Sequence, residues 1–142
     1  MDYRLNLRKD TNGSYLVTFP DLPGVQTFGD TKEKAIGRAA EAFLTGIEFL
    51  IRTRREVPAP RVAGGTRLLV SAMVASKIAL HNLMVRERVN RAELSRRLKI
   101  HRPQVDRLVN LRHGSQLDQI EAAFDALGQR LEISVTKAKK VA

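Results

Sequence analysis

The chain of 142 residues contains no cysteine. This absence excludes disulfide bonds, thiol catalysis and thiolate metal sites, and it is typical of proteins in a reducing cytoplasm. Long apolar runs are missing too, since no stretch approaches the ~20 residues that a membrane-spanning helix requires. The N-terminus, MDYRLNLRKD, alternates polar and apolar side chains and lacks the apolar core of a signal peptide. We therefore expect a cytoplasmic protein that does not bind a membrane.

Histidine is scarce, with 3 residues in the chain. His101 and His113 lie too far apart, without supporting ligands, to form a metal site. His81 falls on a predicted helix, and we interpret it as a surface or boundary residue. We expect neither a metal nor a cofactor.

Acidic residues are few in the second half. Residues 1–65 hold 10 Lys and Arg against 8 Asp and Glu, whereas residues 66–142 hold 15 against 7. A positive charge confined to one half favours binding of a polyanion to that half. Charge that only maintains solubility is the alternative.

The first half has the pattern of a small antiparallel sheet. Apolar residues alternate over residues 3–8 and 14–19, and Asn12-Gly13 between them predicts a two-residue hairpin turn. Two prolines prevent residues 20–24 from continuing a strand, so they form a loop. Residues 25–28 look like a short third strand.

A long amphipathic helix follows at residues 31–52. Asp30 and Glu33 have the spacing of a capping box. The predicted inner face consists of Ile36, Ala40, Phe43, Ile47, Leu50 and Ile51. The prolines and glycines of residues 58–65 then mark a linker. We expect an α+β protein whose first domain covers residues 1–60, with a linker at residues 61–67.

The carboxylates of the first half raise the possibility of a metal-dependent nuclease. Asp2 and Asp10, however, lie at opposite ends of one strand, Asp30 is assigned to the helix cap, and Asp21 occupies a turn where aspartate is common. We therefore expect an interaction surface and no enzyme activity.

The second domain, residues 68–142, is predicted to begin with a strand at 68–71 and a helix at 72–88 that buries Val74, Ile78, Leu83 and Val85. Asn90 caps the next helix, with Glu93 completing a capping box. A turn at Lys99-Ile100 leads to a helix that opens at Pro103 and runs to about Asn110.

These two short helices have the layout of a helix-turn-helix. Arginine can pair with guanine and glutamine with adenine, each discriminating by roughly 1–3 kcal/mol. Asp106 on the same face fits phosphate contact poorly, and a merely solvated arginine face is the alternative interpretation. The predicted DNA contacts are His101, Arg102, Gln104 and Arg107 with Arg96, Arg97, Lys99, Arg112 and His113 around them.

The C-terminal part predicts one more helix and one strand. Ser115 is expected to cap a helix over residues 116–127, with Leu117, Ile120, Phe124 and Leu127 inward. Residues 131–136 alternate like a strand, which needs a partner: either residues 68–70 or the same strand of a second subunit. We favour a symmetric dimer. The tail at residues 137–140 is expected to be disordered.

Residues 13–43, GSYLVTFPDLPGVQTFGDTKEKAIGRAAEAF, resemble the HicB antitoxin family. The signature is a strand ending in FPDLPG, a short strand, then GDT and a helix rich in alanine and glutamate. VPAPR at residues 57–61 resembles the end of that domain. Residues 74–135 are similar to HicB members that carry a helix-turn-helix in place of a ribbon-helix-helix.

The resemblance implies a type II antitoxin, a homodimer or homotetramer with no cofactor. Its first half would be a partial RNase H-like domain that masks a HicA-like RNA-cleaving toxin, and its second half would bind the operator DNA of its own operon. By position, the toxin contacts would be Phe19, Pro20, Asp21, Leu22, Pro23 and Gly24. An inhibitor of a basic RNA-binding toxin is expected to be acidic, yet the first half is slightly basic. Either its acidic residues form a local patch, or packing contributes more to toxin binding than charge does. The alternative is a stand-alone regulator with an N-terminal ligand-sensing or interaction domain.

Overall fold

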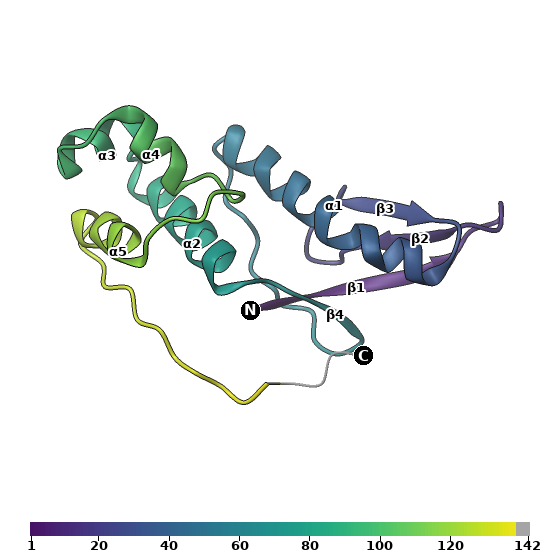
Figure 1. Cartoon of the computed structure of the whole chain (residues 1–142). Coiled ribbons are helices and arrows are strands. Elements are labelled where there is room, and N and C mark those ends of the chain that lie inside the picture. The colour runs from purple at the N-terminus through teal and green to yellow at the C-terminus, as the bar shows by residue number, and fades with distance from the viewer. Residues whose placement is uncertain (139–142) are drawn as a thin grey trace. The chain divides into compact units, whose positions relative to one another are not determined.

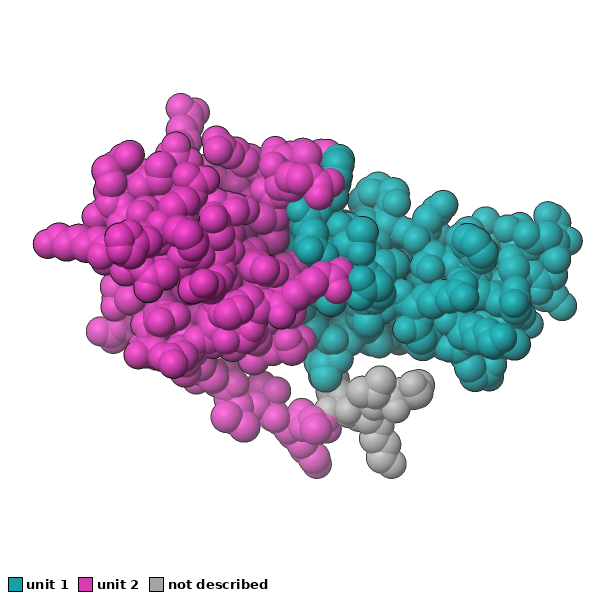
Figure 2. Space-filling view, turned by 45° about the horizontal axis from the view of Figure 1, so that its top comes forward, with its two compact units in different colours: residues 1–50, 57–70, 141–142 teal, residues 51–56, 71–140 magenta. Residues whose placement is uncertain are grey.

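The computed structural model describes residues 1–138 and divides them into two compact units, coloured separately in Figure 2. Among the described residues, the first unit comprises Met1–Leu50 and Val57–Val70, and the second comprises Ile51–Glu56 and residues 71–138. The described part contains four strands and five helices (Figure 1). The predicted α+β class is confirmed.

The first unit is built on a four-stranded antiparallel sheet with the order β3-β2-β1-β4. The strands are β1 (Asp2–Lys9), β2 (Tyr15–Thr18), β3 (Gln26–Gly29) and β4 (Thr66–Leu69). The turn between β1 and β2 is longer than the predicted two residues. Gly13 N donates to Asp10 O at 3.0 Å, and within this turn only Gly13 has a positive φ, +87°. A three-residue loop with a left-handed glycine therefore replaces the two-residue turn.

Strand β4 belongs to the first unit, which corrects the prediction that it starts the second. Tyr3 of β1 pairs with Leu68 of β4, and Val70 N donates to Met1 O at 3.0 Å. The sheet thus recruits β4 from beyond the predicted linker and extends the first unit to Val70. Residues 131–136 form no strand, so the predicted pairing of residues 68–70 with them is not present in the described residues.

Helix α1 (Lys32–Arg52) covers one face of this sheet (Figure 1). Its cap is Thr31, whose Oγ1 accepts from Lys34 N at 3.2 Å, and not Asp30 as predicted. The buried stripe repeats every four residues and consists of Ala35, Ala39, Phe43, Ile47 and Ile51. The predicted face is confirmed at Phe43, Ile47 and Ile51, but it is rotated at the N-terminal end, where Ile36 is 43% exposed.

Small residues allow α1 to lie close to the sheet. A Cβ at Gly29 would stand 2.5 Å from Ala35 N, so only glycine fits at the end of β3. Farther along, the ring of Phe43 packs on Tyr3 and Phe19, with centroid distances of 5.0 and 6.0 Å. These aromatic contacts form the core of the first unit.

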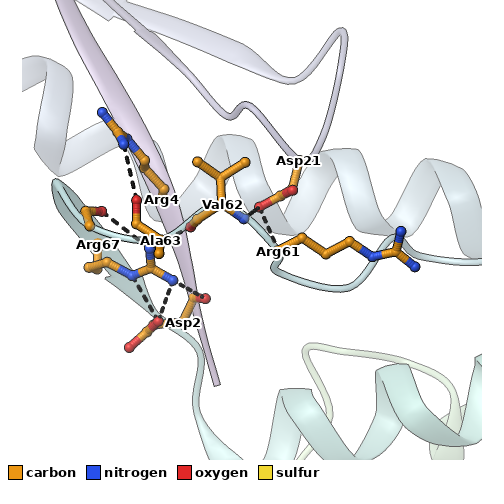
Figure 3. Close-up of polar contacts among 8 residues, drawn as sticks. Asp2, Arg4, Asp21, Arg61, Val62, Ala63 and Arg67 are labelled. Atoms are coloured by element: carbon orange, nitrogen blue, oxygen red, sulfur yellow. Dashed lines mark hydrogen bonds and ion pairs between the residues drawn. The ribbon is translucent and has the colours of Figure 1, made fainter.

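The segment between α1 and β4 is not a free linker, because residues 57–65 are bonded to the sheet and its loops. Tyr3 Oη donates to Pro58 O at 2.6 Å, and Arg4 Nη1 donates to Ala63 O at 3.0 Å. Arg67 pairs with Asp2 at 2.7 Å, and its Nη1 donates to Val62 O, also at 2.7 Å (Figure 3). The composition predicted a linker here, and these side-chain bonds hold its backbone to the first unit.

The second unit contains α2 (Ala72–Glu87), α3 (Arg91–Leu98), α4 (Arg102–Leu108) and α5 (Leu117–Ala126). Of the inner positions predicted for α3, Leu94 is buried and Ala92 and Leu98 are only partly buried, whereas Val105 and Leu108 of α4 are buried as predicted. On α2 the buried face is rotated, because Val74, Leu83 and Val85 are only partly buried. On α5, Leu117 is 45% exposed. The shared apolar core is formed by Leu80, Met84, Val89, Leu94, Val105, Leu108, Val109, Ile120, Ala123, Phe124 and Leu127.

Two helices of this unit end on a cationic residue in the left-handed conformation. Arg88 follows α2 with φ 55°, and Lys99 follows α3 with φ 56°. Glycine is the usual residue at such positions because it has no Cβ to clash. Asn90 caps α3 as predicted, accepting from Glu93 N at 2.8 Å.

The C-terminal segment contradicts one prediction. Residues 131–138 form no strand, although Ile133 and Val135 alternate with polar residues as a strand would. Their side chains are 63% and 97% exposed. In the described residues β4 is an edge strand that pairs with β1, and residues 131–138 add no further strand to that edge. Part of the predicted disordered tail, residues 139 and 140, lies outside the described residues.

Candidate functional site

Helix α4 presents the side chains that were predicted to read DNA. Val105 and Leu108 point into the core, with exposures of 0% and 2%. The predicted reading residues on this helix, Arg102, Gln104 and Arg107, are exposed, as is His101 before it. Amphipathic spacing thus gives a seven-residue helix a buried apolar side and an exposed polar side. The expectation that Gln104 and Arg107 point outward is confirmed.

Gln104 is partly committed within its own helix. Its Oε1 accepts from His101 N at 3.0 Å, which closes the first turn of α4. Recognition of adenine by glutamine uses both ends of the carboxamide. The oxygen has a second lone pair that can accept from adenine, but the bond to His101 N restrains the orientation of the Gln104 carboxamide.

Asp106, the acid on this face, is held by two arginines. Its Oδ1 lies 2.9 Å from Arg91 Nη1 of α3 and 3.4 Å from Arg102 Nε. The pair with Arg91 bridges the two helices, and the contact with Arg102 restrains a predicted DNA-binding side chain. Asp106 therefore organises this face and partly offsets the charge of Arg102.

Arg96 and Arg97 are both paired with Glu93 on α3. The distances from Glu93 are 2.6 Å to Arg96 Nη2 and 3.2 Å to Arg97 Nε. These hydrogen bonds lower the pKa of the Glu93 carboxyl, and the nearby positive charges act in the same direction. The carboxylate thus pairs with arginines and does not complete a capping box with Asn90. Both arginines remain exposed and available at the edge of the face.

Lys77 of α2 is a contributor to this site that sequence reasoning missed. It is fully buried, at 0% exposure. Its Nζ donates to the backbone oxygens of Arg107 and Asn110, both at 2.8 Å, and of His113 at 2.6 Å. It also lies 2.9 Å from Ser115 Oγ. The signal in the sequence was its spacing, since Lys77 precedes the buried residues Leu80, His81 and Met84 by about one and two helical turns.

Ser115 does not cap α5 as predicted. The residue at the cap position is Gln116, while the Ser115 side chain is buried and contacts Lys77. The buried side chains of Lys77 and Ser115 therefore hold the turn between α4 and α5 on its inner side. Its outer side carries Arg112 and His113, both exposed, and Lys99 is exposed at the end of α3.

The loop predicted to contact a protein partner combines buried and exposed residues. Phe19 and Leu22 are each 2% exposed, so their side chains support the loop from within. Pro20, Pro23 and Gly24 are exposed. Asp21 Oδ2 accepts from the backbone nitrogens of Arg61 and Val62, both at 3.1 Å (Figure 3). Its carboxylate therefore ties this loop to the segment before β4.

Two further results concern chemistry that the chain could support. Within residues 1–138, no cluster of three or more His, Asp or Glu side chains has the arrangement of a metal site. His81 is not a surface residue, because it is 5% exposed and its Nε2 lies 2.7 Å from Arg55 O. Burial lowers the pKa of His81.

Within residues 1–138, no helix has the length and hydropathy to cross a membrane.

Comparison with known proteins gives a consistent set of similarities. Residues 2–79 match the family described as HicB-like antitoxin of bacterial toxin–antitoxin systems. Over 133 residues the chain is 38% identical to Antitoxin HicB 2 of Photorhabdus laumondii, covering 94% of this chain and 95% of that protein. Antitoxin HicB of Pseudomonas fluorescens is 34% identical, with coverages of 96% and 95%. Antitoxin HicB of Escherichia coli K12 is 31% identical, with coverages of 94% and 98%.

Proposed function

The chain belongs to the HicB-like antitoxin family of bacterial toxin–antitoxin systems, and on that premise we propose that it has two binding functions. The first unit sequesters a HicA-like toxin that cleaves mRNA. The second unit uses α3 and α4 as a helix-turn-helix that binds operator DNA and represses the operon. The chain itself performs no catalysis in this proposal.

Toxin binding is proposed for the first unit, interpreted as a partial RNase H-like domain. The loop at residues 20–24 offers Pro20 and Pro23 as exposed, rigid apolar contacts. Phe28 on the sheet adds an apolar side chain that is 60% exposed. Residues 1–65 carry a small excess of basic residues. Packing against these apolar groups is therefore a better basis for recognition than attraction to a basic toxin.

DNA binding is proposed for the second unit, and the observation that carries it is the exposure of Arg107 on a helix whose other side is buried. A guanidinium in this position suits guanine in the major groove. Arg96, Arg97, Lys99, Arg112 and His113 surround α4 and suit phosphate contacts, which position the protein without specifying sequence. Asp106 is engaged by arginines and does not leave an unpaired negative charge toward the duplex.

A homodimer is part of the proposal, with residues 131–136 as its contact. Ile133 and Val135 are exposed apolar side chains with strand spacing. Pairing with the same segment of a second copy would satisfy the backbone and bury both side chains. A dimer would also present two copies of α4 to two half-sites of an operator.

The test begins with the neighbouring gene, which we expect to encode a small basic toxin. Co-expression should yield a stable complex that purifies intact. Arg107→Ala should weaken binding to the upstream DNA of the operon and leave neutralisation of the toxin unchanged. Arg130→Ala, which removes another exposed arginine of the same unit, is the control. If Arg107→Ala abolished neutralisation and spared DNA binding, the assignment of functions to the two units would be wrong.

The same preparations separate the proposal from its alternatives. A stand-alone regulator that senses a ligand would purify with a bound metabolite and without a toxin. A nuclease that uses the N-terminal carboxylates would cleave nucleic acid with Mg²⁺ and lose this activity in Asp21→Asn. We expect neither result, because Asp21 is bonded to backbone nitrogens.

A further inference from the structure

Lys77 is a buried cation whose partners are oxygens of the backbone and of one hydroxyl. A charged group that leaves water must be compensated, and an ion partner is the usual means. Here the four oxygens within 2.9 Å belong to three carbonyls and Ser115, so the compensation comes from dipoles. Such an arrangement is specific, because each oxygen must be held at its place around the nitrogen.

The oxygen shell indicates that Lys77 is protonated. An ammonium donates three hydrogen bonds, which matches the three carbonyls. A neutral amine would donate two and would direct its lone pair at the third oxygen. Burial lowers the pKa of Lys77, and the carbonyl dipoles favour the charged form against that effect.

The three carbonyls come from the two elements that carry the predicted DNA contacts. The oxygen of Arg107 lies at the C-terminal end of α4, where backbone carbonyls lack partners within the helix and a cation is favourable. Those of Asn110 and His113 lie in the turn that follows. A helix of seven residues is too short to be stable alone, so its orientation depends on such tertiary bonds.

We propose that Lys77 is a positioning residue for DNA binding, which fixes the spacing between Arg107 on α4 and the phosphate-contacting turn at Arg112 and His113. Lys77 does not touch DNA, and it acts through the backbone that it holds. This inference rests on the proposed DNA-binding function. According to this proposal, a buried residue of the second unit helps to determine the affinity for DNA.

The test uses the full chain with Lys77→Met, which keeps the length of the side chain and removes its charge and donors. The probes are a duplex from the region upstream of its own gene and a duplex of random sequence. We expect affinity for the first duplex to fall about tenfold, within the range for loss of one well-placed arginine contact. The slope of log affinity against log salt should become shallower by about 1, the value for one phosphate contact. Lys137→Met removes the same charge at an exposed position and should change neither quantity.

A double-mutant cycle separates positioning from simple loss of stability. If Lys77 acts through the turn, Arg112→Ala should cost less affinity in the Lys77→Met background than in the wild type. Equal costs in the two backgrounds would overturn the proposal. Amide hydrogen exchange without DNA should increase at residues 109–115 and remain unchanged in α1. If Lys77→Met does not fold, Ser115→Ala removes one of the four oxygens and should show the same effects at smaller size.

The outcomes distinguish this inference from the function on which it rests. If the wild type binds neither duplex, DNA binding fails as a function and the inference fails with it. If the wild type binds and folded Lys77→Met binds equally well, only the inference fails. Weaker binding with a shallower salt slope and a non-additive cycle supports both.

Discussion

Arg91 of α3 and Asp106 of α4 form an ion pair of 2.9 Å that joins the two helices of the candidate helix-turn-helix. The side chains are 35% and 44% exposed, so water screens much of their attraction. Their geometric role is larger, because the pair sets how α4 lies against α3.

The first prediction concerns the strength of this pair. A double-mutant cycle of Arg91→Ala and Asp106→Ala should give a coupling free energy of about 0.2–1 kcal/mol in thermal unfolding at low salt. The coupling should fall toward zero in high salt because ions screen exposed charges. The pair of Arg86 with Glu56, which is more exposed, is the control and should couple less. A large coupling that salt does not change would contradict the screened pair inferred here.

The second prediction concerns Asp21. Asp21→Ala should lower the free energy of unfolding of the first unit by about 1–3 kcal/mol, because it leaves two backbone nitrogens without their acceptor. Asp21→Asn keeps one carbonyl oxygen and should cost less. Chemical denaturation followed by circular dichroism measures both variants. Equal losses would show that the negative charge matters and the acceptor does not.

The third prediction concerns the stability of the first unit at alkaline pH. Burial, and to a smaller extent the charge of Asp21, raises the pKa of Tyr3 from 10.0 to about 12. A raised pKa means that folding favours the neutral phenol, so its contribution is fully present below pH 10.0 and is lost as the pH rises toward 12. The loss should be roughly 2–3 kcal/mol, since each pKa unit corresponds to about 1.4 kcal/mol.

Tyr3→Phe provides the comparison for this measurement. The variant lacks the bond to Pro58 O and should be less stable at neutral pH. The difference between variant and wild type should shrink over the alkaline range. A difference that stays constant from pH 10 to pH 12 would mean that folding does not raise the pKa of Tyr3.

The fourth prediction concerns the proposed dimer. Ile133→Lys places a charge in the apolar row of residues 131–136 and should convert the dimer to a monomer in analytical ultracentrifugation. Ser134→Lys places the same charge on the opposite side of the predicted strand and should leave the dimer intact. If the wild type is monomeric at high concentration, this segment does not pair with a second copy.

Local patterns in the sequence predicted the parts of the fold that depend on local physics. The predicted cap at Asn90 and the predicted turn at Lys99 are confirmed, because helix capping and helix termination depend on neighbouring residues. The exposure of Gln104 and Arg107 followed from the apolar spacing of Val105, Leu108 and Val109. The location of the DNA-binding residues remains a prediction, although all nine side chains in question are exposed.

Features that depend on distant partners were not predictable in the same way. An apolar alternation marks a strand but does not identify its neighbour, so β4 was assigned to the wrong unit and residues 131–136 were expected to pair. A lysine in a helix is exposed by default, and only the oxygens around Lys77 explain its burial. The prolines and glycines of residues 58–65 gave no sign of the side chains that bind this segment.

Arg88 and Lys99 show how charge and stability compete in this chain. A left-handed conformation costs a residue with a Cβ about 1–2 kcal/mol, which glycine does not incur. Arg88→Gly should therefore raise the melting temperature without affecting the operator, because Arg88 lies outside the predicted contacts. Lys99→Gly should raise it equally while weakening attraction to phosphates. A single substitution at either helix end should thus make the protein more resistant to heat. At Lys99 the same substitution would also remove a predicted phosphate contact.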